Sequence, residues 1–386
     1  MKTVCAASVL AGREAFGSLG DVVVRPDDRI GPADVRDADA LIVRSKTRVN
    51  RALLEGSSVA FVGTATAGFD HLDTAWLDAA GLAWCAAPGC NANSVSEYIV
   101  AALLTLARRG GFELAGRTLG VIGVGQVGGR VAAKAGALGL RVLRNDPPLQ
   151  LATQEAIYLP LSEVLREADL VTLHVPLTDA GPFPTRHMAH CDFFARLRPG
   201  ACFLNASRGE VAETDALLLA LGRGAVRAAA LDVWENEPDI PAALLEKAAL
   251  GTPHIAGYSY DGRLNGTVAV YREACRFFET TAAWNTAGTA GPPGAVLEAD
   301  ARGRSDEEIL RDLVRRAYDI EADDAALRRG APGESLADRF RRLRHAYADR
   351  REFPLFTVRL AHGSPGLAQK IATLGFRFSP CPPSEP

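Results

Sequence analysis

Three polar residues that could act together on an alcohol each follow an apolar, strand-like run in the second half of the chain. Arg208 lies in NASRGE, Glu237 lies in DVWENEP, and His254 lies in TPHIAG. A histidine can take the proton of a hydroxyl group, a carboxylate can hold its other ring nitrogen, and an arginine can bind a carboxylate through two hydrogen bonds. Because the carboxyl ends of parallel strands meet at one edge of a sheet, we expect these side chains to share a site. Taken singly, each could instead be a surface or structural residue.

A glycine-spaced turn earlier in the chain predicts a dinucleotide site. In TLGVIGVGQVGG, Gly123, Gly125 and Gly128 fit G-x-G-x-x-G, the pattern that lets backbone approach a pyrophosphate at the start of a helix. A second strand-like run, LRVLRND, ends at Asp146, 18 residues after Gly128. A carboxylate at this place binds the ribose hydroxyls of adenosine and repels a 2′-phosphate, so the sequence predicts NAD rather than NADP.

The sequence predicts that two α/β lobes with parallel sheets position these residues. The first ninety residues alternate strand-like runs with helical patterns, and NSVSEYIVAALLTLARRGG then predicts a long helix capped by Ser94 and Glu97. After further βα repeats, GRLNGTVAVYREACRFFE predicts a helix that returns to the first lobe, and NTAGTAGPPGA has the composition of a linker. We therefore expect a first lobe of residues 1–93 and 258–282, a Rossmann domain of residues 94–257, and a separate α+β module of residues 283–386.

The composition argues against several other classes of function. The chain has 386 residues, a net charge of −3 and 48% hydrophobic residues, so no electrostatic feature indicates nucleic acid as a partner. No apolar run is long enough to span a membrane. The seven cysteines are scattered and lack metal-binding spacing, so they predict reduced thiols in a cytoplasmic protein without a metal site.

The motifs of the second half resemble those of the D-2-hydroxyacid dehydrogenase family. The similar stretches are GVIGVGQVG, NASRGEV, LDVWENEP and TPHIAGYS. The resemblance implies an NAD-dependent enzyme with two Rossmann-like lobes, in which His254 is the general acid/base, Glu237 pairs with it and Arg208 binds the substrate. The cofactor contacts that it implies are Gly123, Gly125, Gln126, Val127, Gly128, Asp146, Val175, Ala206, Ser207, Arg208, Asp232 and Gly257.

Other stretches resemble one branch of this family, which carries an extra C-terminal dimerisation domain. These are ALIVRSKTRVN, FVGTATAGFDHLD, AAPGCNANSVSEY and YDIEADDAALR. They imply a homodimer that oxidises 4-phospho-D-erythronate to 3-hydroxy-2-oxo-4-phosphonooxybutanoate in pyridoxal-phosphate synthesis, with Ser45, Thr66 and Tyr258 as substrate contacts. The residues themselves add a basic strip beside Ser45, made of Arg44, Lys46 and Arg48, whose positive charge suits a phosphate, although RSKTR could also be a solvated loop.

Two departures and two alternatives accompany this hypothesis. The N-terminal CAASVLAG lacks the acidic and polar turn that is usual in the family, and Val175 stands where the family has a threonine. The same trio would serve a phosphoglycerate or a glyoxylate/hydroxypyruvate dehydrogenase, and an NAD-sensing binding protein could keep it without turnover. Within the C-terminal module, we expect Arg350 or Arg351 to reach the site of a neighbouring subunit.

Overall fold

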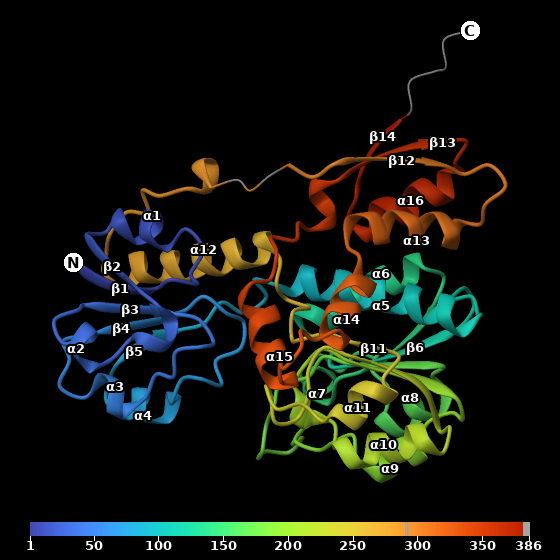
Figure 1. Cartoon of the computed structure of the whole chain (residues 1–386), viewed down its shortest axis with the longest axis horizontal. Helices are drawn as coiled ribbons and strands as arrows, with labels where there is room; N and C mark the ends of the chain where they lie inside the picture. The colour runs from blue at the N-terminus through green and yellow to red at the C-terminus, as the bar shows by residue number, and fades with distance from the viewer. Residues whose placement is uncertain (290, 292, 381–386) are drawn as a thin grey trace, which may run out of the picture. The chain divides into compact units, whose positions relative to one another are not determined.

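The computed structural model describes residues 1–289, 291 and 293–380, and the chain forms two compact units (Figure 1). The first unit contains Met1–Asn91 and Tyr258–Pro293. The second contains Ala92–Gly257 and the described residues from Gly294 on. The C-terminal residues therefore pack in the same unit as the central α/β domain. Residues 381–386 of the expected C-terminal module lie outside the described residues.

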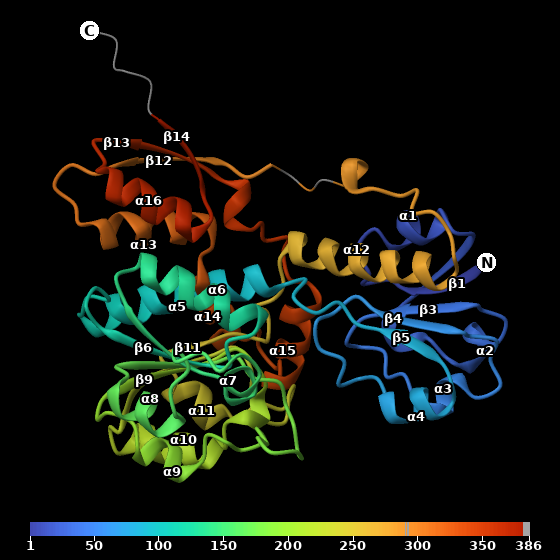
Figure 2. The same cartoon turned by 180° about the vertical axis from the view of Figure 1, so that it is seen from behind.

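The first unit is built on a five-stranded parallel sheet in the order β2-β1-β3-β4-β5. Its strands are β1 (Lys2–Ala6), β2 (Asp21–Arg25), β3 (Ala40–Val43), β4 (Phe61–Thr64) and β5 (Ala83–Cys85). Its helices are α1 (Gly12–Gly17), α2 (Pro32–Val35), α3 (Arg51–Leu54), α4 (Thr74–Ala79) and α12 (Tyr260–Phe277), with 3₁₀ turns at Asp27–Arg29 and Thr286–Gly288. Helices α1 and α12 cover one face, and α2, α3 and α4 cover the other (Figures 1 and 2).

The second unit is built on a six-stranded parallel sheet in the order β11-β10-β9-β8-β6-β7. Its strands are β6 (Thr118–Ile122), β7 (Arg141–Asn145), β8 (Leu170–Leu173), β9 (Ala201–Asn205), β10 (Val226–Leu231) and β11 (Leu250–Gly251). The helices are α5 (Ala92–Gly110), α6 (Gln126–Ala137), α7 (Pro147–Thr153), α8 (Leu161–Glu167), α9 (Cys191–Ala195), α10 (Thr214–Gly222) and α11 (Ala242–Lys247), with a 3₁₀ turn at Gly209–Val211. In both views α5 and α6 lie on one face, and α8 to α11 lie on the other (Figures 1 and 2). The two expected parallel sheets are confirmed.

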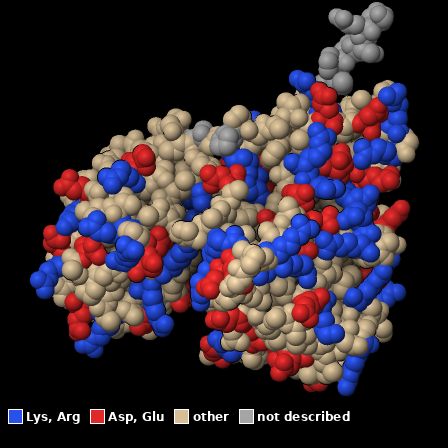
Figure 3. Space-filling view, in the orientation of Figure 1, with Lys and Arg blue, Asp and Glu red and all other residues tan. Residues whose placement is uncertain are grey.

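The C-terminal residues have the predicted α+β character, but they form a layer of the second unit rather than a separate module. Its parallel strands are β12 (Val296–Asp300), β13 (Thr357–Ala361) and β14 (Arg377–Pro380). Its helices are α13 (Asp306–Ala317), α14 (Ile320–Arg328), α15 (Leu336–His345) and α16 (Pro365–Leu374), with a 3₁₀ turn at Phe353–Leu355. Helix α13 packs on α5, α16 packs on α6, and α14 contacts α5 and β11. On the face seen in Figure 3, basic and acidic side chains are interspersed over this layer.

The predicted capping box at the start of α5 is wrong. The helix begins at Ala92, so Ser94 and Glu97 lie inside its first two turns rather than around its N-terminus. The hydroxyl of Ser94 donates to Glu352 Oε1 (2.6 Å), and Glu97 Oε1 accepts from the backbone N–H of Phe353 (2.8 Å). Both side chains therefore form hydrogen bonds with the C-terminal layer instead of capping α5.

Two kinds of feature are absent from the described part of the chain. No helix there combines the length and the apolar character needed to cross a lipid bilayer. Within the same residues, no group of three or more His, Cys, Asp or Glu side chains is arranged to hold a metal ion.

Candidate active site

The strands of the second unit end at the same edge of the sheet. The segments that follow them carry the predicted site residues. Ile122 is in register with Asn145 and with Leu173, Leu173 with Asn205, and Asn205 with Leu231. The segments that follow these strands carry the glycine turn, Asp146, Val175, Arg208 and Asp232. In the sheet, β6 lies between β7 and β8. The strands that come after β7 in the sequence are added on the β8 side, so the direction in which strands are added reverses at β6. Open α/β sheets bind their ligands at such a switch point.

His254 and Glu237 form a hydrogen-bonded pair at this edge. His254 Nδ1 lies 2.7 Å from Glu237 Oε2, and Glu237 Oε1 accepts from the Trp234 backbone N–H at 2.9 Å. Burial alone would raise the pKa of Glu237, but His254, Arg344 and the Trp234 amide outweigh it and hold that pKa below its ordinary value. An ionised Glu237 is only an acceptor, so His254 Nδ1 carries the hydrogen and Nε2 is the nitrogen that can take a proton.

Asp232 fixes the backbone that presents His254. The Asp232 carboxylate is buried and accepts from the Ile255 and Ala256 backbone N–H groups (2.8 and 2.9 Å) and from the Thr252 hydroxyl (2.6 Å). The His254 N–H in turn donates to the Asp232 carbonyl at 2.7 Å. His254 itself has a φ of 57°, in the left-handed region that non-glycine residues rarely occupy. Such strain persists only where the surroundings enforce it, and it is concentrated at functional sites.

Arg208 follows β9, the neighbour of β10 in the sheet. Asn205, the last residue of β9, shapes the segment through its side chain: Oδ1 accepts from the Ser207 N–H and hydroxyl (3.0 and 2.8 Å), and Nδ2 donates to the Arg208 carbonyl (2.9 Å). The Arg208 guanidinium is half-buried, and its Nη1 donates to the Ser207 carbonyl at 2.8 Å. Ala206 and Ser207 are thus held in a tight turn beside the strand end.

The glycine turn has the shape that a dinucleotide requires. Gly123 has a φ of 82°, and a Cβ there would stand 2.5 Å from the His174 carbonyl oxygen. A Cβ on Gly128 would stand 1.9 Å from the Gly123 carbonyl oxygen, so close packing of α6 against β6 requires glycine. A Cβ on Gly125 would meet nothing within 4 Å, which leaves the backbone at the start of α6 open to a phosphate. These residues fit NAD.

Asp146 is tied to the same turn. Its Oδ2 accepts from the Val124 N–H at 2.7 Å, and its Oδ1 accepts from the Leu149 N–H at 3.0 Å, where it caps α7. Each carboxylate oxygen has a second lone pair, so Asp146 can still accept from ribose hydroxyls. Among the remaining predicted contacts, Gln126 and Val127 open α6, and Gly257 ends the His254 loop.

Val175, at the position where the family has a threonine, presents an apolar side chain to the glycine turn. Its side chain lies against Gly123, where a Cβ would approach it to 2.9 Å. The preceding residue, His174, shares a hydrogen bond with the Thr172 hydroxyl (3.0 Å), and burial lowers the pKa of His174 to about 3. His174 is therefore a neutral structural residue, and this wall of the turn is apolar.

The predicted substrate contacts lie in the first unit. Ser45 follows β3 and Thr66 follows β4, whose ends are in register at Val43 and Thr64. The Thr66 hydroxyl donates to the Gly68 carbonyl at 2.7 Å. Of the basic strip, Arg44 is buried with its guanidinium 5.3 Å from the centre of the Tyr258 ring, whereas Lys46 and Arg48 are exposed.

The sequence did not single out two contacts near the His254–Glu237 pair. Arg344 Nη1 lies 3.9 Å from Glu237 Oε2, and a second histidine–carboxylate pair joins His187 Nε2 to Glu235 Oε1 at 2.6 Å. Arg344 is one of many arginines in its segment, so no local signal distinguishes it. The expected reach of Arg350 or Arg351 into a neighbouring subunit's site stays a prediction. Within its own chain, Arg350 is buried, and its Nη2 donates to the Ala256 and Ser94 carbonyls (2.7 and 3.3 Å).

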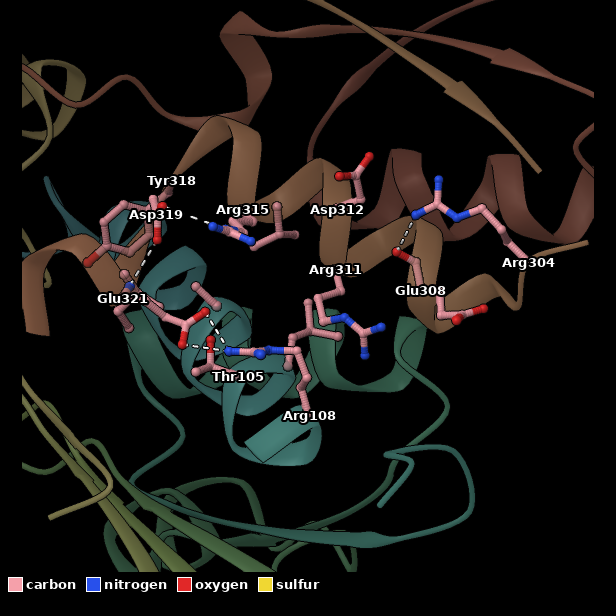
Figure 4. A pocket seen from close by; sticks show the side chains of 14 residues that line it. Thr105, Arg108, Arg304, Glu308, Arg311, Asp312, Arg315, Tyr318, Asp319 and Glu321 are labelled. Carbon is pink, nitrogen blue, oxygen red and sulfur yellow. Dashed lines mark hydrogen bonds and ion pairs between the residues drawn. The ribbon is translucent and has the colours of Figure 1, made fainter. Parts of the chain in front are cut away.

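A cavity of about 190 Å³ between α5 and the C-terminal layer contains none of the predicted site residues (Figure 4). Its wall is lined with charged side chains from α5, α13 and α14. These charges pair with one another: Arg108 donates to Glu321 (2.6 Å), and Arg315 lies 3.6 Å from Asp319. The cavity is therefore a gap between packed helices that is lined by paired charged side chains.

Comparisons with known proteins agree with this geometry. A model described as "D-isomer specific 2-hydroxyacid dehydrogenase, NAD binding domain" matches residues 98–256, and a domain of unknown function, DUF3410, matches residues 292–375. Erythronate-4-phosphate dehydrogenase of Citrobacter koseri is 45% identical over 97% of this chain and 98% of its own. The proteins of the same name from Salinibacter ruber and Escherichia coli O157:H7 are 47% identical (89% of this chain, 90% of theirs) and 42% identical (97% and 98%).

Solved structures share the fold of most of the chain. D-lactate dehydrogenase of Aquifex aeolicus, complexed with NAD and lactic acid, has a TM-score of 0.61 at 26% identity and covers 72% of this chain and 95% of its own. NAD-bound 3-phosphoglycerate dehydrogenase of Entamoeba histolytica has a TM-score of 0.64 at 23% identity, with coverage of 72% and 95%. Together with the near full-length relatives, these matches show that the chain belongs to the D-isomer-specific 2-hydroxyacid dehydrogenases, in the branch of the erythronate-4-phosphate dehydrogenases.

Proposed function

We propose that this protein oxidises 4-phosphoerythronate at C2 to its 2-oxo acid, with His254, Glu237 and Arg208 as its catalytic residues. The observation that carries the proposal is the His254–Glu237 pair, held at the same sheet edge as the glycine turn. The near full-length similarity to erythronate-4-phosphate dehydrogenases supports the substrate.

His254 and Glu237 would move the hydroxyl proton. Neutral His254 takes the C2 hydroxyl proton on Nε2 while Nδ1–H donates to Glu237 Oε2. Glu237 then stabilises the imidazolium, as the carboxylate of a histidine–carboxylate pair does. When bound, NAD accepts the hydride that leaves C2, so the carbon ends as a ketone.

Arg208 would hold and polarise the substrate. Its planar guanidinium can bind the C1 carboxylate through two hydrogen bonds and donate to the oxygen that becomes the carbonyl. The cofactor would be held by the glycine turn of residues 123–128, by Asp146, and by the loops that carry Val175, Ala206, Ser207, Asp232 and Gly257.

The phosphate would be recognised by the first unit. We propose Ser45, Thr66 and Tyr258 as substrate contacts, with Arg44 as the nearby cation. Burial lowers the pKa of Arg44, but a guanidinium stays charged at neutral pH, and a buried cation favours an anionic ligand. Arg263 on α12 contributes charge close to Arg44.

The C-terminal layer is proposed as a homodimer interface. One face of its sheet is covered, with Leu297 and Val358 buried, whereas Val296, Glu298 and Arg359 on the other face are exposed. Sedimentation equilibrium is expected to give twice the mass of one chain. A single-chain mass at micromolar concentration would contradict the dimer.

The catalytic roles are tested by His254→Asn. Loss of the base is expected to lower kcat by about 10²–10⁴-fold, while NADH binding, followed by its fluorescence, stays within a few-fold of the unchanged protein. His190→Asn is a matched control, because His190 is exposed at the start of α9 and asparagine can also cap a helix. Near-normal turnover of His254→Asn would overturn the assignment.

A further inference from the structure

A cation from the C-terminal layer lies beside the catalytic pair. Arg344 Nη1 is 3.9 Å from Glu237 Oε2, the same oxygen that His254 Nδ1 approaches to 2.7 Å. The side chains of Arg344, Glu237 and His254 are 22%, 18% and 30% exposed, so water screens their charges only in part. At 3.9 Å the guanidinium acts on the carboxylate through charge rather than through a direct hydrogen bond.

The packing of α15 places Arg344 at this point. Phe340 is buried in the core that contains Trp234 and Ile240, which flank Glu237 in sequence, and Leu343 packs against the same core. Arg344 is four residues after Phe340, so both lie on the same face of α15. The apolar contacts of this helix therefore fix where the guanidinium stands.

We infer that Arg344 is a positioning residue of the active site, whose positive charge keeps Glu237 ionised and opposes protonation of His254. A histidine beside a lone carboxylate holds its proton more tightly, whereas a nearby cation offsets that effect. The inference rests on the proposed role of His254, and it gives the C-terminal layer a part in the chemistry of its own chain.

Other charged residues lie on the segments next to the pair. Asp232 follows β10 and is committed to the His254 loop, Arg208 follows β9, and Glu235 is paired with His187. His345 is next to Arg344 on α15. Arg344→Met leaves these side chains in place.

The test compares Arg344→Met with Arg344→Lys and with the control Arg341→Met. Arg341 lies on the same helix, is 57% exposed and pairs with Asp338, so its loss removes an equal charge away from the site. The first measurement is the pH dependence of kcat/KM for oxidation of 4-phosphoerythronate. We expect the acid limb of Arg344→Met to move upward by about 0.5 to 1 on the pH scale, while Arg344→Lys and Arg341→Met stay near the unchanged protein.

The second measurement is independent of turnover. The ring protons of His254 are titrated by NMR in the protein without cofactor or substrate and are assigned by their loss in His254→Asn. An upward move of the titration midpoint in Arg344→Met alone supports the inference, even if another residue proves to be the base. If neither the titration midpoint nor the acid limb moves in Arg344→Met, the inference is overturned. If kcat falls but the midpoint and the acid limb stay the same, Arg344 has a structural role only, and the inference is again overturned.

Discussion

At the scale of the residue, Glu97 on α5 shows how burial and hydrogen bonding oppose one another in one carboxyl group. It is almost fully buried on α5, where it accepts from Asn93 Nδ2 and from the Phe353 backbone N–H (both 2.8 Å) and lies 3.8 Å from Lys134 Nζ. Burial nevertheless raises the pKa of Glu97 to about 8. A carboxyl group with a raised pKa in the folded protein favours the folded state at low pH, and this contribution is lost as the pH rises toward that value.

Glu97→Gln keeps the accepting oxygen and removes the titration. We therefore expect the free energy of unfolding of Glu97→Gln, relative to the unchanged protein, to increase from about pH 5 to about pH 8. Urea denaturation at several pH values measures this difference. Glu246→Gln on the exposed face of α11 is the control and should show a constant difference. A pH-independent difference for Glu97→Gln would show that Glu97 stays ionised in the fold.

At the scale of the element, the close approach of α6 to β6 is set by Gly128. A Cβ at this position would stand 1.9 Å from the Gly123 carbonyl oxygen, so Gly128→Ala must displace the glycine turn, the proposed pyrophosphate site. We expect NADH affinity to fall at least tenfold and thermal stability to fall with it. In the same helix, a Cβ on Gly136 would meet nothing within 4 Å. Gly136→Ala should keep NADH affinity and gain up to about 1 kcal/mol of stability.

Fluorescence titration with NADH and thermal unfolding compare the two variants. Equal NADH affinity in Gly128→Ala and Gly136→Ala would contradict the role given to the glycine turn.

The elements also show what could be predicted from the sequence. The strand-like run LRVLRND, which ends at Asp146, predicts the end of β7 at Asn145 to within one residue, because the period and length of a buried parallel strand are local properties. The start of α5 could not be predicted in the same way. Ser94 and Glu97 match a local capping pattern, but their partners are Glu352 and Phe353, more than 250 residues further along the chain.

At the scale of the whole molecule, the candidate site draws on segments that no single motif covers. Arg208, Glu237 and His254 could be predicted because each follows a recognisable strand in a family-like motif. Arg344 could not, because its segment RFRRLRH holds several arginines and only the packing of Phe340 decides which one stands beside Glu237. The strained φ of His254 and the role of Asp232 in holding its loop likewise depend on tertiary contacts.

The central claim is that the protein acts on a phosphorylated four-carbon 2-hydroxy acid. The most direct measurement is NADH formation from 4-phosphoerythronate, D-3-phosphoglycerate and D-lactate by the unchanged protein, by Arg44→Met and by the exposed control Arg48→Met. We expect the highest kcat/KM with 4-phosphoerythronate, and we expect this preference to be lost in Arg44→Met but kept in Arg48→Met. A higher kcat/KM with D-lactate or D-3-phosphoglycerate would contradict the account of the substrate.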